Sequence, residues 1–446
     1  MVNTEGGGAG NGTEGAERNL GMLDATGVVV SSIVGIGIFL TVPDVARALP
    51  TPGWFFGMWM VCGVLSLMGA LANAELGTLF PQAGGSYTFA RHAFGPSAAF
   101  ASGCLCFFGV YAGTVATLAV GLVDAARSVV PIAEGARMPI SVAIVAVLTA
   151  LNAMGTRRVA RINAIVAFAK VAAMVLVFGA AAKVSATDSL PSTGQVEPSL
   201  RAASKAFSPV LFSYLGWNAS VFIANHVREP RKNIPRSVVL GLAISTIVYL
   251  ALNASFVRVL GLGAMANAQD VGSRAMVTAF GTGAQRLFST LVLVSIGGTL
   301  IANAFVGPRI VYAMAKEGAL PARLGSTHAD GTPMPAFWAQ GIAAIAIIVV
   351  LRKFPSALDF TTFATVLATT ADVVAVFVMR KKLPQAPRYA CPGYPWLPAV
   401  YVIVHVGIAV AIAWNSPREA GIGTLLLVLA FAFEARRTRS RRAKAV

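Results

Sequence analysis

Apolar stretches of about 20 residues recur from residue 24 to residue 434 of this chain. A helix of about 20 residues is long enough to cross roughly 30 Å of hydrocarbon. Charged residues make up only 12% of the chain and hydrophobic residues 56%, whereas a soluble domain carries about 25% charged residues. The sequence therefore predicts an all-α polytopic membrane protein and argues against a soluble enzyme and against a disordered chain.

The apolar runs, separated by charged residues, Pro and Gly, predict about twelve transmembrane helices. The expected spans are residues 24–48, 54–79, 97–123, 138–154, 160–182, 203–224, 236–258, 287–314, 334–351, 357–379, 395–414 and 419–434. An even number of spans places both termini on the same side of the membrane.

The net charge of +17 raises the question of a nucleic-acid partner. The basic residues, however, lie in short clusters between the spans and not along one helix face. With the N-terminus inside, most Lys and Arg fall in inner segments, as the positive-inside rule requires. We therefore expect no nucleic acid, a multi-pass protein of the cell (plasma) membrane with both termini cytoplasmic, a disordered tail over residues 1–21, and a basic tail over residues 436–446 that contacts lipid headgroups.

Two of the expected spans contain polar and glycine residues at mid-membrane. The first span contains Ser31-Ser32-Ile33-Val34-Gly35-Ile36-Gly37-Ile38-Phe39, and the sixth contains Phe212-Ser213-Tyr214-Leu215-Gly216-Trp217-Asn218. Glycine lowers helix propensity, and a broken helix in hydrocarbon is tolerated only beside a cavity or other protein. Interruptions at corresponding positions of two halves are typical of a midplane binding site in transporters. The alternative is that small residues only let the helices pack closely.

A series of short motifs follows the chain in order from about residue 22 to residue 400. The motifs are Gly35 to Phe39, Pro52-Gly53-Trp54, Ala74-Glu75-Leu76-Gly77, Phe80-Pro81-Gln82-Ala83-Gly84-Gly85-Ser86-Tyr87, Ala93-Phe94-Gly95-Pro96, Gly216-Trp217-Asn218, residues 229–236, Gly307-Pro308-Arg309 and Cys391-Pro392-Gly393-Tyr394-Pro395. In this order they resemble the signatures of the amino acid-polyamine-organocation (APC) superfamily of permeases. The nearest subgroup is similar to prokaryotic neutral amino acid permeases related to the L-type transporters.

This resemblance implies a five-plus-five inverted repeat with helices 1 and 6 broken. Residues 22–182 would form the first repeat, residues 203–382 the second, and residues 393–435 two extra C-terminal helices. No internal sequence similarity between the two halves supports the repeat independently.

An α-amino acid presents a carboxylate, which needs hydrogen-bond donors, and an ammonium, which needs acceptors. The ends of broken helices supply both, through free N–H and C=O groups. By resemblance, the carboxylate would be held by Ser31, Ser32, Gly35, Ile36 and Gly37. The ammonium would be held by the carbonyl groups of Phe212, Ser213 and Leu215.

Three further residues are candidates for the substrate pocket: Trp217, Asn218 and Asn303. Trp217 is equally well explained by helix packing. Asn218 stands where related arginine or diamine antiporters carry an acidic residue, and an amide provides no countercharge for a cationic side chain. The sequence therefore favours a neutral substrate.

Lys170 lies near the middle of the fifth span, where a charge is costly and indicates function by default. The alternative is a side chain that reaches the membrane surface, but long apolar flanks separate Lys170 from both surfaces. The resemblance to proton-coupled and L-type relatives implies that its ammonium lies beside the broken first helix, where sodium sits in sodium-coupled relatives. We expect Lys170 to be the coupling residue.

Other titratable residues in or near the spans have less certain roles. Glu75 belongs to a family motif and is expected to organise the cytoplasmic side, whereas Asp372 is either structural or cavity-facing. His226, with Asn225, replaces the usual small-acidic pair at the end of the sixth span; it either titrates near neutral pH or is an interfacial residue. Asn73 replaces a common Tyr. These departures concern cytoplasmic gating and not the fold.

The leading functional prediction is a secondary active transporter of neutral L-amino acids, driven by protons or by exchange. One alternative is an amine or polyamine transporter, which Asn218 disfavours. Another is an amino acid sensor, for which tails of about 20 and 12 residues leave little room for an output domain.

We expect neither a cofactor nor a metal, because the chain has no phosphate-binding loop and no catalytic triad or metalloprotease motif in a supporting context. The four cysteines occupy apolar or near-membrane positions, which favours buried thiols over a zinc site. None stands clearly in the outer loop between spans three and four, so no heavy-chain partner linked by a disulfide is expected.

Overall fold

The computed structural model describes residues 20–35, 37–80, 85–127, 129–153, 159–184, 199–218, 221, 227–328, 332–386 and 388–444. Within these ranges the chain forms helices and no strand, and its one isolated backbone bridge joins Leu20 to Val227. The prediction of an all-α fold is confirmed.

The helices follow one another along the chain with short connections. They are α1 (Met22–Ile33), α2 (Gly37–Ala48), α3 (Pro52–Leu79), α4 (Ser86–Phe94), α5 (Pro96–Cys104), the π-helix η1 (Leu105–Ala112), α6 (Gly113–Ala126), the 3-10 turn η2 (Glu134–Ala136), α7 (Arg137–Ala153), α8 (Val159–Lys183), α9 (Leu200–Ser213), α11 (Pro230–Leu260), α12 (Leu262–Ala266), α13 (Val271–Phe280), α14 (Thr282–Lys316), the 3-10 turn η4 (Ala322–Gly325), α15 (Met334–Leu351), α16 (Phe354–Lys382), α17 (Trp396–Asn415) and α18 (Pro417–Lys444).

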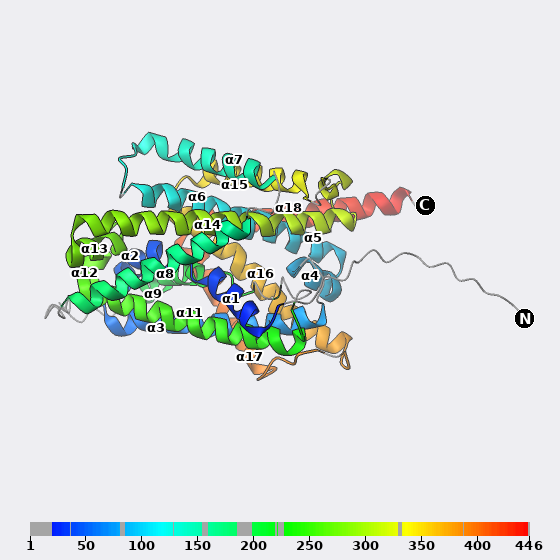
Figure 1. Ribbon diagram of the computed structural model, residues 1–446. Helices are drawn as coiled ribbons and strands as arrows, with labels where there is room; N and C mark the ends of the chain where they lie inside the picture. The colour runs from blue at the N-terminus through cyan, green and yellow to red at the C-terminus, as the bar shows by residue number, and fades with distance from the viewer. Residues whose placement is uncertain are drawn as a thin grey trace, which may run out of the picture.

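The long helices run side by side in one bundle (Figure 1). Helices α14, α16 and α18 finish at the end of the bundle where α4 lies, and α12 and α13 lie at the opposite end. The last turn of α14 contains Lys316, and the last turn of α16 contains Arg380, Lys381 and Lys382. We call this the basic end of the bundle.

Eight helices of the described part are long and apolar enough to cross a membrane, and the bent pair α1 and α2 would make a ninth. The eight are Pro52–Leu79, Pro96–Ala126, Glu134–Asn152, Pro230–Leu260, Thr282–Lys316, Met334–Leu351, Phe354–Lys382 and Trp396–Asn415. The other three expected spans correspond to α8, α9 and α18, and α9 is only 14 residues long. The count of twelve and the inverted repeat remain predictions.

Many large apolar side chains lie on the outside of the bundle. Phe168 is 72% exposed, Ile403 70% and Trp414 74%. A soluble protein rarely exposes so much apolar surface, whereas the hydrocarbon of a bilayer is a favourable environment for it. The surface therefore agrees with a multi-pass membrane protein.

Candidate functional site

The first expected span is divided into α1 and α2, whose axes differ by 49°. α1 ends at Ile33 and α2 begins at Gly37. The sixth expected span is interrupted as well, because α9 ends at Ser213 and residues 214–218 form turns. Both interruptions fall where the Gly and polar residues of the sequence lowered helix propensity.

The two interruptions are in direct contact. Gly216 has a φ of +104°, a conformation that L side chains rarely adopt, and a Cβ atom there would lie 2.7 Å from the backbone oxygen of Ser32. Gly37 is equally close to the other helix, because its Cβ would lie 2.7 Å from Cα of Ser213. Glycine at these two positions is therefore what lets the broken helices touch.

Hydroxyl groups join the start of α2 to the end of α9. Thr41 Oγ1 and Ser213 Oγ are 3.0 Å apart. Each hydroxyl also donates to its own helix, Thr41 to the oxygen of Gly37 at 2.7 Å and Ser213 to the oxygen of Pro209 at 2.9 Å. These bonds fix the first turn of α2 against the last turn of α9.

Tyr249 of α11 connects the ends of both broken helices. Its hydroxyl oxygen lies 2.6 Å from the backbone oxygen of Ile33 and 2.7 Å from that of Ser213. A phenol has one hydrogen to donate, so the two carbonyl groups share a single donor. Tyr249 is fully buried, and its position sets the separation of the two helix ends.

Lys170 of α8 contacts the last turn of α1. Its ammonium donates to the backbone oxygen of Ser31 at 2.8 Å. The side chain is only 8% exposed, although its neighbours Phe168 and Val171 are 72% and 59% exposed. Lys170 therefore points into the bundle and places a cation at the C-terminal end of α1, where the helix dipole is negative.

The other expected carboxylate-binding residues have different surroundings. The Ser31 side chain is exposed and donates to the oxygen of Val28 in its own helix at 3.1 Å. Ser32 is half-buried at the contact with Gly216. Gly35 is buried, and a Cβ there would meet nothing closer than 3.7 Å. Ile36 lies outside the described residues.

The expected amine-binding residues form the end of α9. The oxygen of Phe212 accepts a hydrogen bond from the N–H of Leu215 at 3.1 Å. The Phe212 ring packs edge-on against Phe354 with centroids 6.4 Å apart. The oxygen of Ser213 is the one that Tyr249 contacts. Because Phe212 and Ser213 have protein partners in this conformation, their carbonyl groups would have to exchange those partners to hold an ammonium.

Trp217 and Leu215 line a cavity of about 20 Å³. Its other walls are formed by Ser66, Leu211, Thr362, Thr365, Val366, Thr369, Tyr401 and His405. Trp217 is buried, Asn218 is half-buried beside it, and Asn303 of α14 is half-buried and donates to the oxygen of Thr299 at 2.9 Å. Thr299 is also the side chain nearest to Gly35, which brings Asn303 within one helical turn of the first break.

The structure and the sequence chemistry together describe a site that suits a zwitterion. The start of α2 presents N–H groups and a positive dipole end, which favour a carboxylate. The ends of α1 and α9 present carbonyl groups, which favour an ammonium. The described residues contain no group of three or more His, Cys, Asp or Glu that would hold a metal ion.

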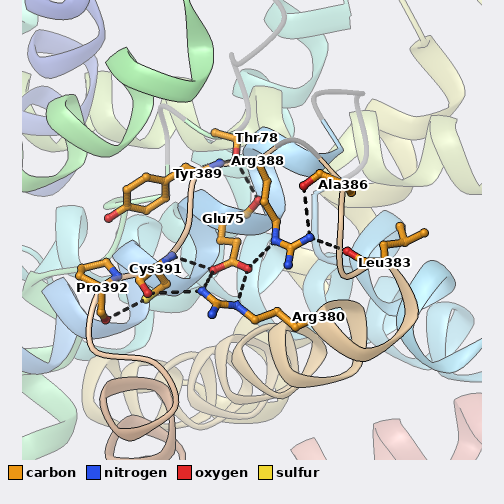
Figure 2. Close-up of polar contacts among 9 residues, drawn as sticks. All are labelled: Glu75, Thr78, Arg380, Leu383, Ala386, Arg388, Tyr389, Cys391 and Pro392. Atoms are coloured by element: carbon orange, nitrogen blue, oxygen red, sulfur yellow. Dashed lines mark hydrogen bonds and ion pairs between the residues drawn. The ribbon is translucent and has the colours of Figure 1, made fainter.

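Glu75 is the centre of a second polar cluster, at the basic end of the bundle (Figure 2). Its carboxylate accepts from Arg380 Nε at 2.8 Å and Nη2 at 2.7 Å, and from Arg388 Nε at 3.0 Å. A fourth bond comes from the N–H of Cys391 at 2.8 Å. Glu75 is 1% exposed, so its burial is compensated by two cations and a backbone donor.

The Glu75 cluster fastens the loop between α16 and α17 to the end of α3. The N–H of Tyr389 donates to Thr78 Oγ1 at 3.0 Å. Arg388 donates also to the oxygen of Leu383 at 2.6 Å, and the Arg380 guanidinium lies 3.8 Å from the centre of the Tyr394 ring. We call residues 383–395 the strap. Burial raises the pKa of the Cys391 thiol to about 12.

Sequence reasoning missed Tyr249 and both arginine partners of Glu75. Tyr249 has one sequence signal, a hydroxyl inside the apolar run of α11, because a buried Tyr needs a hydrogen-bond partner. The partners of Glu75 have no local signal, since Arg380 lies 305 residues away. His226 and Asn225 lie outside the described residues.

Comparisons with known proteins agree with these features. A profile described as amino acid permease matches residues 20–433. The chain is 25% identical over 440 residues to the human large neutral amino acids transporter small subunit 2, covering 94% of this chain and 80% of that protein. It is 27% identical over 425 residues to the human cystine/glutamate transporter, covering 92% and 83%. The mouse Asc-type amino acid transporter 1 is 24% identical over 431 residues, with 92% and 79% covered.

Proposed function

The chain belongs to the amino acid permease family, and we propose that it is a secondary active transporter that moves neutral L-amino acids across the cell membrane by alternating access. The family and the relatives are transporters, so the expectation that the chain is not an enzyme is confirmed. We infer coupling to protons or obligatory exchange as the source of energy.

The observation that carries this proposal is the contact between the two broken helices. The start of α2 and the end of α9 meet through Gly37 and Ser213, and Tyr249 lies between the carbonyl groups that end α1 and α9. This arrangement offers donors and acceptors within a few ångströms, which is what an α-amino acid needs. A change in the separation of the helix ends would open and close the site.

Asn218 supports a neutral substrate. The residue is half-buried in the turn that follows α9, and its amide adds no negative charge beside the proposed ammonium site. A cationic side chain would then be desolvated without a partner, which costs several kcal/mol. Large neutral amino acids are in the printed name of one relative, whereas cystine and glutamate are in that of another. The choice among neutral side chains belongs to experiment.

We propose that the basic end faces the cytoplasm, because Lys and Arg are retained on that side. Both termini would then be cytoplasmic if α8, α9 and α18 also span the membrane, which completes the twelve spans and the five-plus-five repeat. Lys170 would hold the first break from the side of α8, as a resident cation in the place of a bound metal ion.

We also propose that the chain works without a disulfide-linked partner. One relative is named a small subunit, which raises the question of a larger partner. The four cysteines of this chain are buried, and buried thiols are poorly placed to form a bond to another chain. A non-reducing gel of the protein from its native membrane tests this directly, because a heavier band that collapses on reduction would contradict the proposal.

Purified protein in liposomes tests the proposed function. We expect uptake of a radiolabelled neutral amino acid such as leucine or alanine, stimulated by internal amino acid or by an inward proton gradient. Arginine and putrescine serve as cationic competitors, and we expect them to compete weakly. Uptake of putrescine or arginine in preference to every neutral amino acid would favour the amine transporter instead.

A further inference from the structure

Asp372 of α16 is a buried acid without a charged partner among the described residues. It is 2% exposed. Asn73 Nδ2 donates to it at 3.1 Å and Ser86 Oγ at 2.7 Å. Both donors are neutral and both reach the same oxygen, Oδ2. The other oxygen, Oδ1, takes part in neither bond.

The groups that face Asp372 come from four packed elements. η1 contributes Cys106 and Tyr111, and α17 contributes Tyr401. His405 stacks on Tyr401 with centroids 3.7 Å apart and bonds to the backbone of its own helix. The charged residues of the other two elements are paired elsewhere: Glu75 of α3 with Arg380 and Arg388, and Arg91 of α4 with Glu317. No Lys or Arg of the described part therefore compensates a charge on Asp372.

An ionised carboxylate in this position is costly. Removing a charge from water without a counter-ion costs far more than two neutral hydrogen bonds return. A protonated carboxylic acid has no net charge and loses little on burial. Asp372 is therefore expected to be neutral when protein encloses it and to ionise when water reaches it.

Asp372 lies between the basic end and the proposed substrate site. Eight residues of α16 separate it from Arg380, which corresponds to roughly 12 Å along the helix. In the other direction, Thr369 is one turn away and lines the cavity of about 20 Å³ that Leu215 and Trp217 also line. A cavity of this size holds about one water molecule. Tyr401 faces both the cavity and Asp372, so a short polar route joins the acid to the substrate site.

The element packed against this part of α16 is unusual. η1 is a π-helix, a form that occurs mostly as short insertions and often at functional sites. It lies close to α16, because a Cβ on Gly109 would be 2.5 Å from Cβ of Ala364. A small shift of η1 relative to α16 would change access to Asp372.

We propose that Asp372 is the proton-binding site that couples proton movement to substrate movement. Oδ1 of the carboxylate takes up one proton from water on one side of the membrane and becomes a neutral carboxylic acid. The same proton leaves to water on the other side after the conformational change. Lys170 stays a resident cation on Ser31. This inference rests on the proposed function and deepens it by naming the site of the coupled ion.

Reconstituted protein with a pH-sensitive dye inside the liposomes tests the proposal. Labelled amino acid exchange and substrate-driven proton movement are measured on the same vesicles. We expect Asp372→Asn, which imitates the protonated acid, to keep exchange within about two-fold of wild type and to lose proton movement by about ten-fold or more. The matched control is Asp359→Asn at the other end of α16, where the carboxylate is also bound by two hydroxyl groups, those of Ser208 and Ser416. We expect both activities to survive in the control.

The outcomes separate this inference from the proposed function. Proton movement of normal size in Asp372→Asn overturns the inference. Substrate transport by wild type without any proton movement also overturns it, but leaves the proposed function in place. A wild-type protein that transports no amino acid overturns the proposed function and the inference with it.

A second measurement applies if Asp372→Asn does not fold. Infrared difference spectra of protein labelled with ¹³C-aspartate are recorded between acidic and alkaline pH. We expect an isotope-shifted carboxylic acid band that disappears at alkaline pH and is absent from Asp372→Glu, in which position 372 carries no label. No such band in wild type, or its persistence in Asp372→Glu, overturns the proposal.

Discussion

The ammonium group of Lys170 lies 2.8 Å from the backbone oxygen of Ser31, in the last turn of the first half-helix. A cation at the end of a helix stabilises it through the dipole, typically by about 0.3–1 kcal/mol and more where it is partly buried. The same contact ties α8 to the first break. Any movement of α1 therefore has to break this bond or carry α8 along.

Lys170→Ala should leave the protein in the membrane and strongly reduce uptake, because it removes the charge that joins α8 to α1. Lys170→Arg keeps the charge but changes its geometry, and we expect partial binding with poor turnover. The control is Lys183→Ala, at the exposed end of the same helix. Measurement of uptake per folded protein decides the matter, and wild-type uptake with unchanged pH dependence in Lys170→Ala would exclude the coupling role.

Tyr249→Phe should weaken substrate binding, because it removes the single donor shared by Ile33 and Ser213. An unsatisfied buried carbonyl group costs about 1–3 kcal/mol, and an effect of about 1.4 kcal/mol on binding is ten-fold in affinity. Tyr214→Phe is the matched control, since its hydroxyl donates to the oxygen of Trp59 at 3.0 Å. We expect both variants to lose stability and only Tyr249→Phe to lose affinity. Equal affinity in the two variants would mean that Tyr249 acts only in packing.

The sequence was informative where a local cost was visible, and silent where the partner is distant. The breaks at Gly35 and Gly216 were predicted from glycine in hydrocarbon, and the inward direction of Lys170 from the cost of a buried charge. Whether the substrate binds there remains a prediction. Glu75 was recognised from its motif, but its fastening to Arg388 depends on how α3 meets the strap, 313 residues later. Propensity and periodicity describe neighbours along the chain and cannot supply such pairs.

Gly37→Ala and Gly35→Ala should have different effects on stability. A Cβ at Gly37 would lie 2.7 Å from the backbone of Ser213, whereas one at Gly35 would have nothing closer than 3.7 Å. Overpacking costs typically 1–3 kcal/mol, so we expect Gly37→Ala to lower the temperature of thermal unfolding and Gly35→Ala to leave it almost unchanged.

Gly35 also has a predicted role in binding. Gly35→Val places a branched side chain where the carboxylate is expected to approach the N–H groups, so it should reduce substrate affinity more than abundance in the membrane. Unchanged affinity in Gly35→Val would show that the carboxylate is held elsewhere. Thermal unfolding of the purified variants and competition binding are the two measurements.

Cys391 reports whether the strap is closed. Only the thiolate reacts with maleimide or iodoacetamide, and burial raises the pKa of Cys391 to about 12 from its usual 9.0. A raised pKa means less thiolate, so labelling of wild type should be slow at pH 8 and rise about ten-fold for each pH unit. Arg388→Ala removes bonds to Glu75 and Leu383 and should speed labelling at pH 8 by about ten-fold or more.

Arg352→Ala serves as the control for the strap, because this exposed residue donates to the oxygen of Val349, in α15 and outside the strap. Mass spectrometry of the labelled peptide identifies Cys391 among the four cysteines. Labelling of Arg388→Ala as slow as that of wild type would mean that Arg388 does not hold the strap closed.

The last prediction concerns substrate choice at Asn218, which is half-buried in the turn after α9. Asn218→Asp adds a negative charge of nearly the same shape beside the proposed ammonium site. One ion pair in a low-dielectric pocket gains several kcal/mol before desolvation is subtracted. We expect a net gain of about 1–2 kcal/mol, or roughly ten-fold in the affinity for arginine or lysine relative to alanine. Competition binding with neutral and cationic amino acids measures this, and Asn267→Asp, at an exposed position before α13, controls for the added charge. An unchanged ranking in Asn218→Asp would place the side chain outside the pocket and remove the main argument for a neutral substrate.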